Sequence, residues 1–222
     1  MKRVPTTELL DSDAGTPAEI AASLADLGRV NRWFGGVDTS EALIERVARR
    51  LGPRDLSLLE IAAGSGDVPN LAAARLRRRG INVRVLLLDR ARSHLSGSNP
   101  RVVADALALP FSDGSFDLVS SCLFVHHLAP QQLTEFVQEG LRVCRKAFLM
   151  NDLIRSPLHL IAVYAGYLLY RSRLTRHDAP ASVRQAYTVE EMRNLTSRIQ
   201  GTQVDIQRHY FYRMGVTVWK EP

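Results

Sequence analysis

Apolar runs that carry a single acid at or near their end are the feature that most limits the fold of this chain. The segment 82–89, NVRVLLLD, is apolar without interruption from Val85 to Leu88 and ends in Asp89. Such a run is typical of a strand buried on both faces, which occurs in parallel sheets covered by helices on each side. Similar runs occur at 56–61 and 146–152, and helix-like segments lie between them. We therefore predict an α/β chain with a doubly wound, mostly parallel sheet.

The remaining patterns predict a seven-stranded, Rossmann-like sheet with an antiparallel edge, N-terminal helices and a helical insert after the fifth strand. Thr16, Pro17 and Glu19 predict the start of a helix that ends at Gly35–Gly36, because they combine a capping box with proline at the first helical position. We expect helices near 40–51, 67–79, 131–144 and 188–199, and strands near 56–64, 82–89, 101–111, 115–125 and 146–152, with two more within 203–220. We expect a single domain over 1–222, with a helical cap at 1–36 and an insert at 153–187.

Composition excludes several classes of protein but does not identify this one. The chain has 222 residues, is 45% hydrophobic and has two cysteines, so we expect a globular core without a disulfide framework. No CxxC motif or Cys/His cluster indicates a metal, and we expect none. The first residues lack the apolar region of a signal peptide, so a cytoplasmic location is expected. The apolar stretch 158–170 is shorter than the roughly 20 residues of a membrane span. We interpret it as a buried helix, or one that could contact a membrane interface.

A loop of very small residues follows the first predicted strand. The segment LLEIAAGSGD, 58–67, gives a ligand close access to the main chain, because Gly64 and Gly66 have no Cβ. A dinucleotide loop would have a third glycine where Pro69 stands, and the GK[ST] of a Walker loop is missing. Asp67 begins the next helix, where its charge would repel a phosphate. The loop therefore suits a ligand that is not anionic at this point.

Acids at three successive strand ends complete a nucleoside-like pattern. Glu60, Asp89 and Asp105 each close an apolar run, and ligands of such sheets bind beyond the carboxyl ends of the strands. Asp89 follows the loop by about the distance at which an acid holds a ribose diol in dinucleotide-binding folds.

These motifs together resemble those of the class I S-adenosylmethionine-dependent methyltransferases. The resemblance covers about residues 55–150 and rests on LLEIAAGSGD, VLLLD, VVADALALPFSDGSFDLVSS and CLFVHHL. The family loop usually begins with glycine where this chain has Ala62, a departure that also occurs in quinone-biosynthesis methyltransferases. The segment NRWFGG, 31–36, resembles the part of those enzymes that closes over the cofactor.

The resemblance implies S-adenosylmethionine as the cofactor and assigns its contacts. It implies that Glu60 orders the loop and the methionine amino group, and that Asp89 takes the ribose hydroxyls. Asp105 would accept the adenine amino group. The full set of implied cofactor-binding residues is Glu60, Ala62, Gly64, Gly66, Asp89, Arg90, Asp105, Ala106, Ser121 and Cys122, with Arg90 on the adenine and the last two beside the sulfonium.

Four residues are candidates for moving the acceptor's proton. A phenol or enol acceptor must lose a proton, and a histidine is suited to this near pH 7. His126 and His127 follow the fourth strand, and because adjacent residues point in different directions we expect one to face the site, with His127 preferred. Asp152 ends the fifth strand beside the same cleft. His177 is a further candidate, in a polar cluster of Arg176, His177, Asp178 and Arg184 that we expect to serve no helix or strand.

The expected activity is methyl transfer to a small apolar acceptor, an aromatic or polyketide hydroxyl. Tyr164, Tyr167 and Tyr170 at helical spacing in the insert support an apolar acceptor, although such a stripe is also typical of a core. The nearest alternative is C-methylation of a quinone precursor. More remote alternatives are a nucleic-acid methyltransferase, suggested by the net charge of +6, and a cofactor-binding protein without activity. We expect no nucleic-acid partner, because SSCL stands where amine-methylating enzymes of nucleic acids carry [ND]PP[YF]. The oligomeric state is left open.

Overall fold

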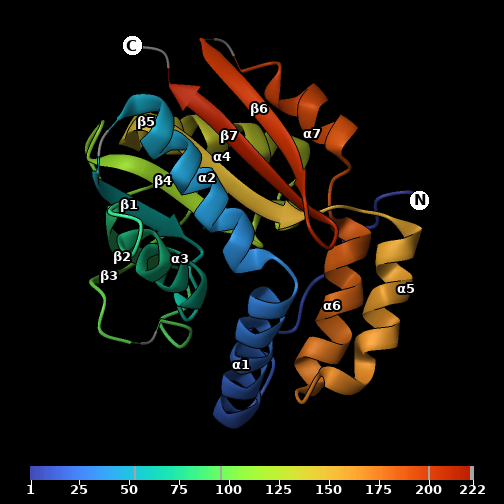
Figure 1. The fold of residues 1–222 in the computed structure, drawn as a ribbon. Helices are drawn as coiled ribbons and strands as arrows, with labels where there is room; N and C mark the ends of the chain where they lie inside the picture. The colour runs from blue at the N-terminus through green and yellow to red at the C-terminus, as the bar shows by residue number, and fades with distance from the viewer. Residues whose placement is uncertain (53, 96, 200, 221–222) are drawn as a thin grey trace.

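One seven-stranded sheet organises the structure (Figure 1). The computed structural model describes residues 1–52, 54–95, 97–199 and 201–220. The strand order is β3-β2-β1-β4-β5-β7-β6; only β7 runs against its neighbours, between β5 and β6. The strands are β1 Asp55–Ile61, β2 Asn82–Asp89, β3 Arg101–Val103, β4 Phe116–Cys122, β5 Cys144–Leu153, β6 Thr202–His209 and β7 Arg213–Lys220. The predicted doubly wound, mostly parallel sheet is confirmed.

Helices cover both faces of the sheet and one of its ends (Figure 1). α2 and α3 bury Leu43, Val47 and Leu76 on one face, whereas α4 packs Phe136 and Val137 on the other. α1, α5 and α6 stand together beyond the carboxyl ends of the parallel strands. The helices are α1 Pro17–Trp33, α2 Gly36–Leu51, α3 Asp67–Arg77, α4 Pro130–Val143, α5 Pro157–Ala165, α6 Arg173–Gln185 and α7 Val189–Thr196, with short 3₁₀ turns η1 Val125–His127 and η2 Gly166–Leu169.

The predicted helix starts are confirmed where capping residues marked them. Thr16 and Glu19 form a reciprocal capping box at α1, and Thr188 and Glu191 form another at α7. α2 begins at Gly36, four residues earlier than predicted. Here a left-handed Gly35 precedes the helix without a side-chain cap, so no polar residue marked the start.

The expectation that the polar cluster 176–184 serves no helix was wrong. These residues lie on α6, which Ser172 caps by accepting a hydrogen bond from the Leu174 backbone N–H. The buried side of α6 includes polar side chains such as Thr175, Asp178 and Gln185, so the segment lacks the apolar stripe that marks most helices.

Three strands are shorter than predicted, and the first strand of the chain ends at Ile61. The third ends at Val103, and the fourth at Cys122, where η1 follows. The apolar residues after Val103 pack on the core without strand pairing. There Glu139 accepts a hydrogen bond from the Leu109 N–H and Arg142 donates to the Leu109 carbonyl, so side chains take over the role of a neighbouring strand.

Part of the positive charge is neutralised within the fold. Arg75 at the end of α3 pairs with Asp38 and Glu41 of α2, and Arg79 pairs with Glu41 and Glu45. No helix in the described part of the chain is both long and apolar enough to cross a membrane.

Candidate functional site

A cavity of about 490 Å³ lies at the carboxyl ends of the strands, between the sheet, α1, α6 and the N-terminal segment. Its size falls within the range of small-molecule sites. Of the residues that the sequence indicated, those in the cavity wall are Glu60, Ala62, Gly64, Asp89, Arg90, Asp105, Ala106, Cys122, His126 and His127. Those not found in the wall are Gly66, Ser121, Asp152 and His177.

The small-residue loop after β1 uses its two glycines differently. A Cβ on Gly64 would meet only Leu24 within 4 Å, at 3.7 Å, so this position opens toward the cavity. A Cβ on Gly66 would lie 2.5 Å from Leu87, so this glycine permits packing on β2. Ala62 has φ 53°, a left-handed conformation that costs roughly 1–2 kcal/mol in an L-residue. The position at which this chain departs from the usual glycine is therefore strained.

Asp89 ties two cavity loops together. One oxygen of its carboxylate accepts a hydrogen bond from the Gly64 N–H at 2.9 Å, and the other accepts from the Ala91 N–H at 2.9 Å. A carboxylate offers about four lone-pair positions, so capacity remains for hydroxyl donors from the cavity. Asp105 holds its own turn by accepting from the Leu107 N–H, and it lines the cavity beside Ala106.

Glu60 is a buried acid in the cavity wall. Burial raises the pKa of its carboxyl to about 7, although the hydroxyl of Ser120, which donates to it, acts in the opposite direction. Because this pKa lies near neutral pH, the Glu60 carboxyl can readily be protonated or bind a cationic group at that pH. Burial likewise raises the pKa of the nearby Cys122 to about 12, so that thiol stays neutral.

Arg213 is a cavity residue that the sequence did not indicate. Its guanidinium is buried in the wall and donates to the side-chain oxygens of Asn31, at 2.6 Å, and Asn151, at 3.4 Å. Among the described residues no carboxylate forms an ion pair with it. A buried cation without an anionic partner favours an anionic ligand group at this point.

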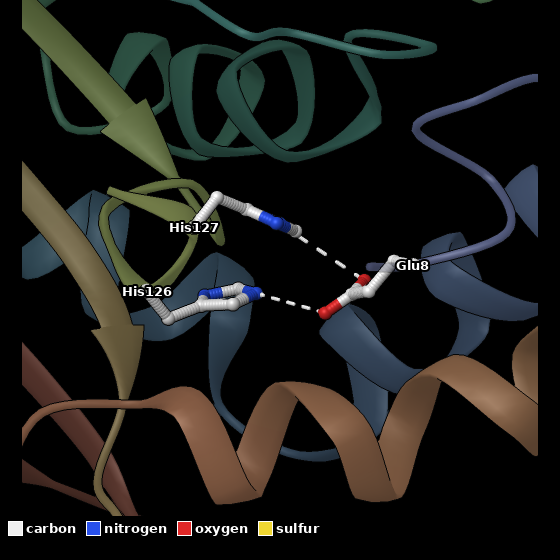
Figure 2. A group of neighbouring side chains, drawn as sticks. All are labelled: Glu8, His126 and His127. Carbon is white, nitrogen blue, oxygen red and sulfur yellow. Dashed lines mark ion pairs between the residues drawn. The ribbon is translucent and has the colours of Figure 1, made fainter. Parts of the chain in front are cut away.

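A carboxylate and two imidazoles meet in the cavity wall (Figure 2). Nε2 of His126 lies 3.5 Å from Oε1 of Glu8, and Nε2 of His127 lies 4.0 Å from Oε2. Glu8 is held by Ser182 and Gln185 of α6, which donate to Oε1 at 2.6 and 2.7 Å. The N-terminal segment thus brings an acid to the two histidines, which lie far from it in the sequence.

The two histidines differ in the acid that contacts Nδ1 of each ring. Nδ1 of His126 hydrogen-bonds Asp152 at 2.7 Å, and both residues are 2% exposed. Burial alone would lower the pKa of His126, but the charges of Asp152 and Glu8 outweigh it and raise the pKa to about 10. Burial would raise the pKa of Asp152, but the charge of His126 and its hydrogen bond lower it. His126 is therefore a buried imidazolium near pH 7 and cannot accept a proton there.

His127 is better placed to accept a proton. Nδ1 lies 2.9 Å from Oδ2 of Asp11, and the ring lines the cavity. Burial would raise the pKa of Asp11, but the hydrogen bond and charge of His127 lower it, so the carboxylate is ionised. A carboxylate beside Nδ1 favours the tautomer with the proton on Nδ1, which leaves an unprotonated Nε2 at 4.0 Å from Oε2 of Glu8.

Asp178 fixes the segment that carries Glu8 and Asp11. Its two oxygens accept hydrogen bonds from the backbone N–H groups of Leu9 and Leu10, at 2.8 and 3.0 Å. The neighbouring His177 is exposed and lies outside the cavity wall, 2.8 Å from Asp178. The structure thus brings His126, His127 and Asp152 together and leaves His177 apart from them. Both His126 and His127 line the cavity, so the expectation that only one of them faces the site was wrong.

Part of the chain is similar in sequence to known methyltransferases. Residues 59–147 match the family model of a methyltransferase domain. A ubiquinone/menaquinone biosynthesis C-methyltransferase of Dinoroseobacter shibae is 28% identical over 142 residues, 59% of this chain and 53% of that protein. The corresponding protein of Roseobacter denitrificans is 29% identical over the same shares. The chain thus spans about half the length of these relatives.

Solved structures share the fold across nearly the whole chain. The plantazolicin methyltransferase BpumL, solved with a desmethylPZN analog and SAH, superposes with a TM-score of 0.71 at 12% identity, covering 97% of this chain and 95% of that one. A SAM-dependent methyltransferase from Aquifex aeolicus gives a TM-score of 0.58 at 13% identity, over 93% of this chain and 100% of that one. At these identities the likeness establishes the fold.

Proposed function

We propose that this chain is a class I S-adenosylmethionine-dependent methyltransferase that methylates an apolar, hydroxyl-bearing aromatic acceptor. The observation that carries the proposal is the pairing of His127 with Asp11 in the wall of a largely apolar cavity. The apolar side chains of this wall that lie toward the insert and the N-terminal segment are Leu10, Leu153, Val163, Tyr170 and Val183. An apolar acceptor gains from burial against them, whereas a nucleic-acid strand would need cationic and stacking groups.

The residues of the cavity fit the cofactor that the family uses. Gly64 opens toward the cavity and Asp89 keeps hydrogen-bonding capacity for ribose hydroxyls. Glu60 would take the methionine amino group. The carboxylate of the same methionine would suit Arg213, whose charge has no anionic partner among the described residues. When bound, S-adenosylmethionine supplies an electrophilic methyl group on sulfur.

His127 supplies the proton acceptor in this proposal. The acceptor O–H bond breaks, its proton goes to Nε2 of His127, and the oxygen electron pair forms the new bond to the methyl carbon. The pair of the broken carbon–sulfur bond stays on sulfur. The imidazolium that forms lies between Asp11 and Glu8, whose charges stabilise it. Holding the two reactants in line and away from water supplies much of the acceleration.

C-methylation of a quinone precursor is the second candidate, because the matching relatives carry that activity in their names. The same cavity residues, including His127, would serve C-methylation. A phenolate is nucleophilic at its oxygen and at its ortho carbon, and in the latter case the ring carbon loses its proton after the methyl group is added. Removal of the hydroxyl proton by His127 precedes both outcomes.

The test is incubation of the protein with methyl-labelled S-adenosylmethionine and a panel of alkylphenols, quinols and polyketide phenols. We expect labelled product, and fragmentation by mass spectrometry then assigns the methyl group to oxygen or carbon. Cofactor binding without transfer to any acceptor in the panel would contradict the proposal and favour a binding protein without activity.

Cofactor affinity should depend on pH through Glu60. In the protein without cofactor, the pKa of Glu60 is about 7. A cationic ligand group binds the ionised carboxylate better than the protonated acid, so lowering the pH weakens cofactor binding. We expect S-adenosylmethionine to bind about tenfold more weakly at pH 6 than at pH 8, since protonation of one group accounts for this ratio. Calorimetric titration measures the dissociation constants. Glu60→Gln should bind weakly at both pH values, and an unchanged pH dependence in this variant would show that another group is responsible.

A further inference from the structure

The outward side of the insert formed by α5 and η2 exposes several large apolar side chains. Leu158 and Ile161 are each 63% exposed and Leu168 is 94% exposed. The complete set, called the insert patch below, is Leu158, Ile161, Tyr164, Tyr167, Leu168 and Leu169. These six are half of the large hydrophobic residues exposed in the described chain, gathered on twelve consecutive positions. Patches of this kind mark interaction sites.

Helical spacing explains why these residues share one side. Leu158, Ile161 and Tyr164 follow one another at intervals of three on α5, which places them on one face, and Leu168 follows them on η2. The opposite side of the insert faces the protein, because His159 and Tyr170 are buried and line the cavity. The insert patch therefore lies on the outside of the wall that encloses the acceptor end of the cavity.

Arginines border the insert patch. The guanidinium of Arg184 donates to the hydroxyl of Tyr164 at 2.7 Å and lies 5.7 Å from its ring centre. Arg176 lies 5.6 Å from the ring centre of Tyr167. Arg171 follows the insert and is exposed. Within the described residues none of these three arginines forms an ion pair with a carboxylate, so their charges face outward uncompensated.

We propose that the insert patch docks the protein on an anionic lipid bilayer, from which the apolar acceptor enters the cavity. The entry of the acceptor from the bilayer rests on the proposed function, whereas the docking rests on the insert patch itself. Leucine and isoleucine on one face enter the acyl boundary, tyrosines lie at the headgroup level, and arginines meet anionic headgroups. A second copy of this chain fits less well, because a two-fold contact through this face would bring the two arginine sets together.

The docking is tested by flotation with vesicles of phosphatidylcholine containing 30% phosphatidylglycerol. We expect the wild-type protein to float with these vesicles, and Leu168→Glu to bind at least tenfold more weakly. Leu51→Glu is the matched control, because it makes the same change at an exposed leucine on α2 and should float like wild type. Arg176→Gln should reduce binding about fivefold, the effect of roughly 1 kcal/mol per arginine near the surface.

The transfer step is tested separately so that the two proposals can fail independently. On a short, water-soluble alkylphenol, Leu168→Glu should match wild type, whereas on a long-chain alkylphenol held in vesicles it should lose at least tenfold in rate. Absence of turnover with flotation intact overturns the proposed function alone. Equal flotation of wild type and Leu168→Glu overturns the docking. So does a wild-type dimer in sedimentation that Leu168→Glu dissociates, because that result makes the patch a contact between copies.

Discussion

Replacing His127 with glutamine is expected to lower kcat by 10²–10⁴-fold, the usual contribution of a positioned general base. The Nε2 lone pair disappears, while a side chain of similar length still fills the space between Asp11 and Glu8. The dissociation constant of S-adenosylmethionine should stay within about twofold, since proton transfer and cofactor binding use different parts of the cavity. Methyl-transfer kinetics and calorimetry measure the two quantities.

Acceptor acidity separates a base from a residue that only shapes the cavity. A nitrophenol is largely ionised at pH 8 and needs no base, so His127→Gln should lose far less rate on it than on an alkylphenol. An equal loss on both acceptors would contradict the role of base. His177→Gln removes a further histidine that was a candidate base, which lies 2.8 Å from Asp178, and a larger loss there would transfer the role to His177.

A metal would change the meaning of the same residues. The nitrogen and oxygen atoms of Glu8, His126 and His127 that could bind a metal lie within 4.8 Å of one another, and two imidazoles with a carboxylate are ligands that zinc accepts. We expect methyl transfer to continue after dialysis against EDTA. Activity that is lost on chelation and restored by Zn²⁺ would show that these atoms hold a metal, and His127 could then not act as a free base.

The sheet, and the part of the cavity wall that the strand ends form, could be predicted from the sequence because their signals are local. An apolar run ending in Asp89 predicts a strand and the place of its acid in one step. The small-residue loop likewise predicts that a ligand can approach the backbone closely at Gly64. The second glycine, Gly66, shows the limit of this reasoning, because only the structure reveals that its missing Cβ makes room for Leu87.

The part of the cavity wall around the two histidines could not be predicted in this way, because its residues meet from distant parts of the chain. Glu8 and Asp11 reach the histidines only because Asp178, on a helix without an apolar stripe, fixes their segment. Arg213 enters the cavity from the last strand, where no motif accompanies it. Local patterns carry no information on such contacts, so the sequence offered His126 and His127 as near equals. Their different partners, Asp152 and Asp11, separate their roles.

Asp152→Asn is expected to reduce the free energy of unfolding by about 3 kcal/mol at pH 6, because it leaves the buried imidazolium of His126 without its main counter-charge. Urea denaturation measures this difference. Asp113→Asn is the matched control: it makes the same change in an exposed ion pair with Arg142 and should cost less than about 1 kcal/mol. Similar losses in the two variants would mean that the buried pair contributes no more than a surface pair.

The pH dependence of this difference follows from the two shifted pKa values. The pKa of His126 is raised from 6.5 to about 10 by folding, so its contribution is complete below pH 6.5 and is lost as the pH rises toward 10. The pKa of Asp152 is lowered below 3.8, so its contribution is complete above that pH and is lost only in stronger acid. The gap between wild type and Asp152→Asn should therefore be widest between about pH 4 and 6.5 and should narrow steadily toward pH 10. A gap that stays constant from pH 6 to pH 10 would mean that His126 is neutral in the folded protein, and His126 would then compete with His127 as the base.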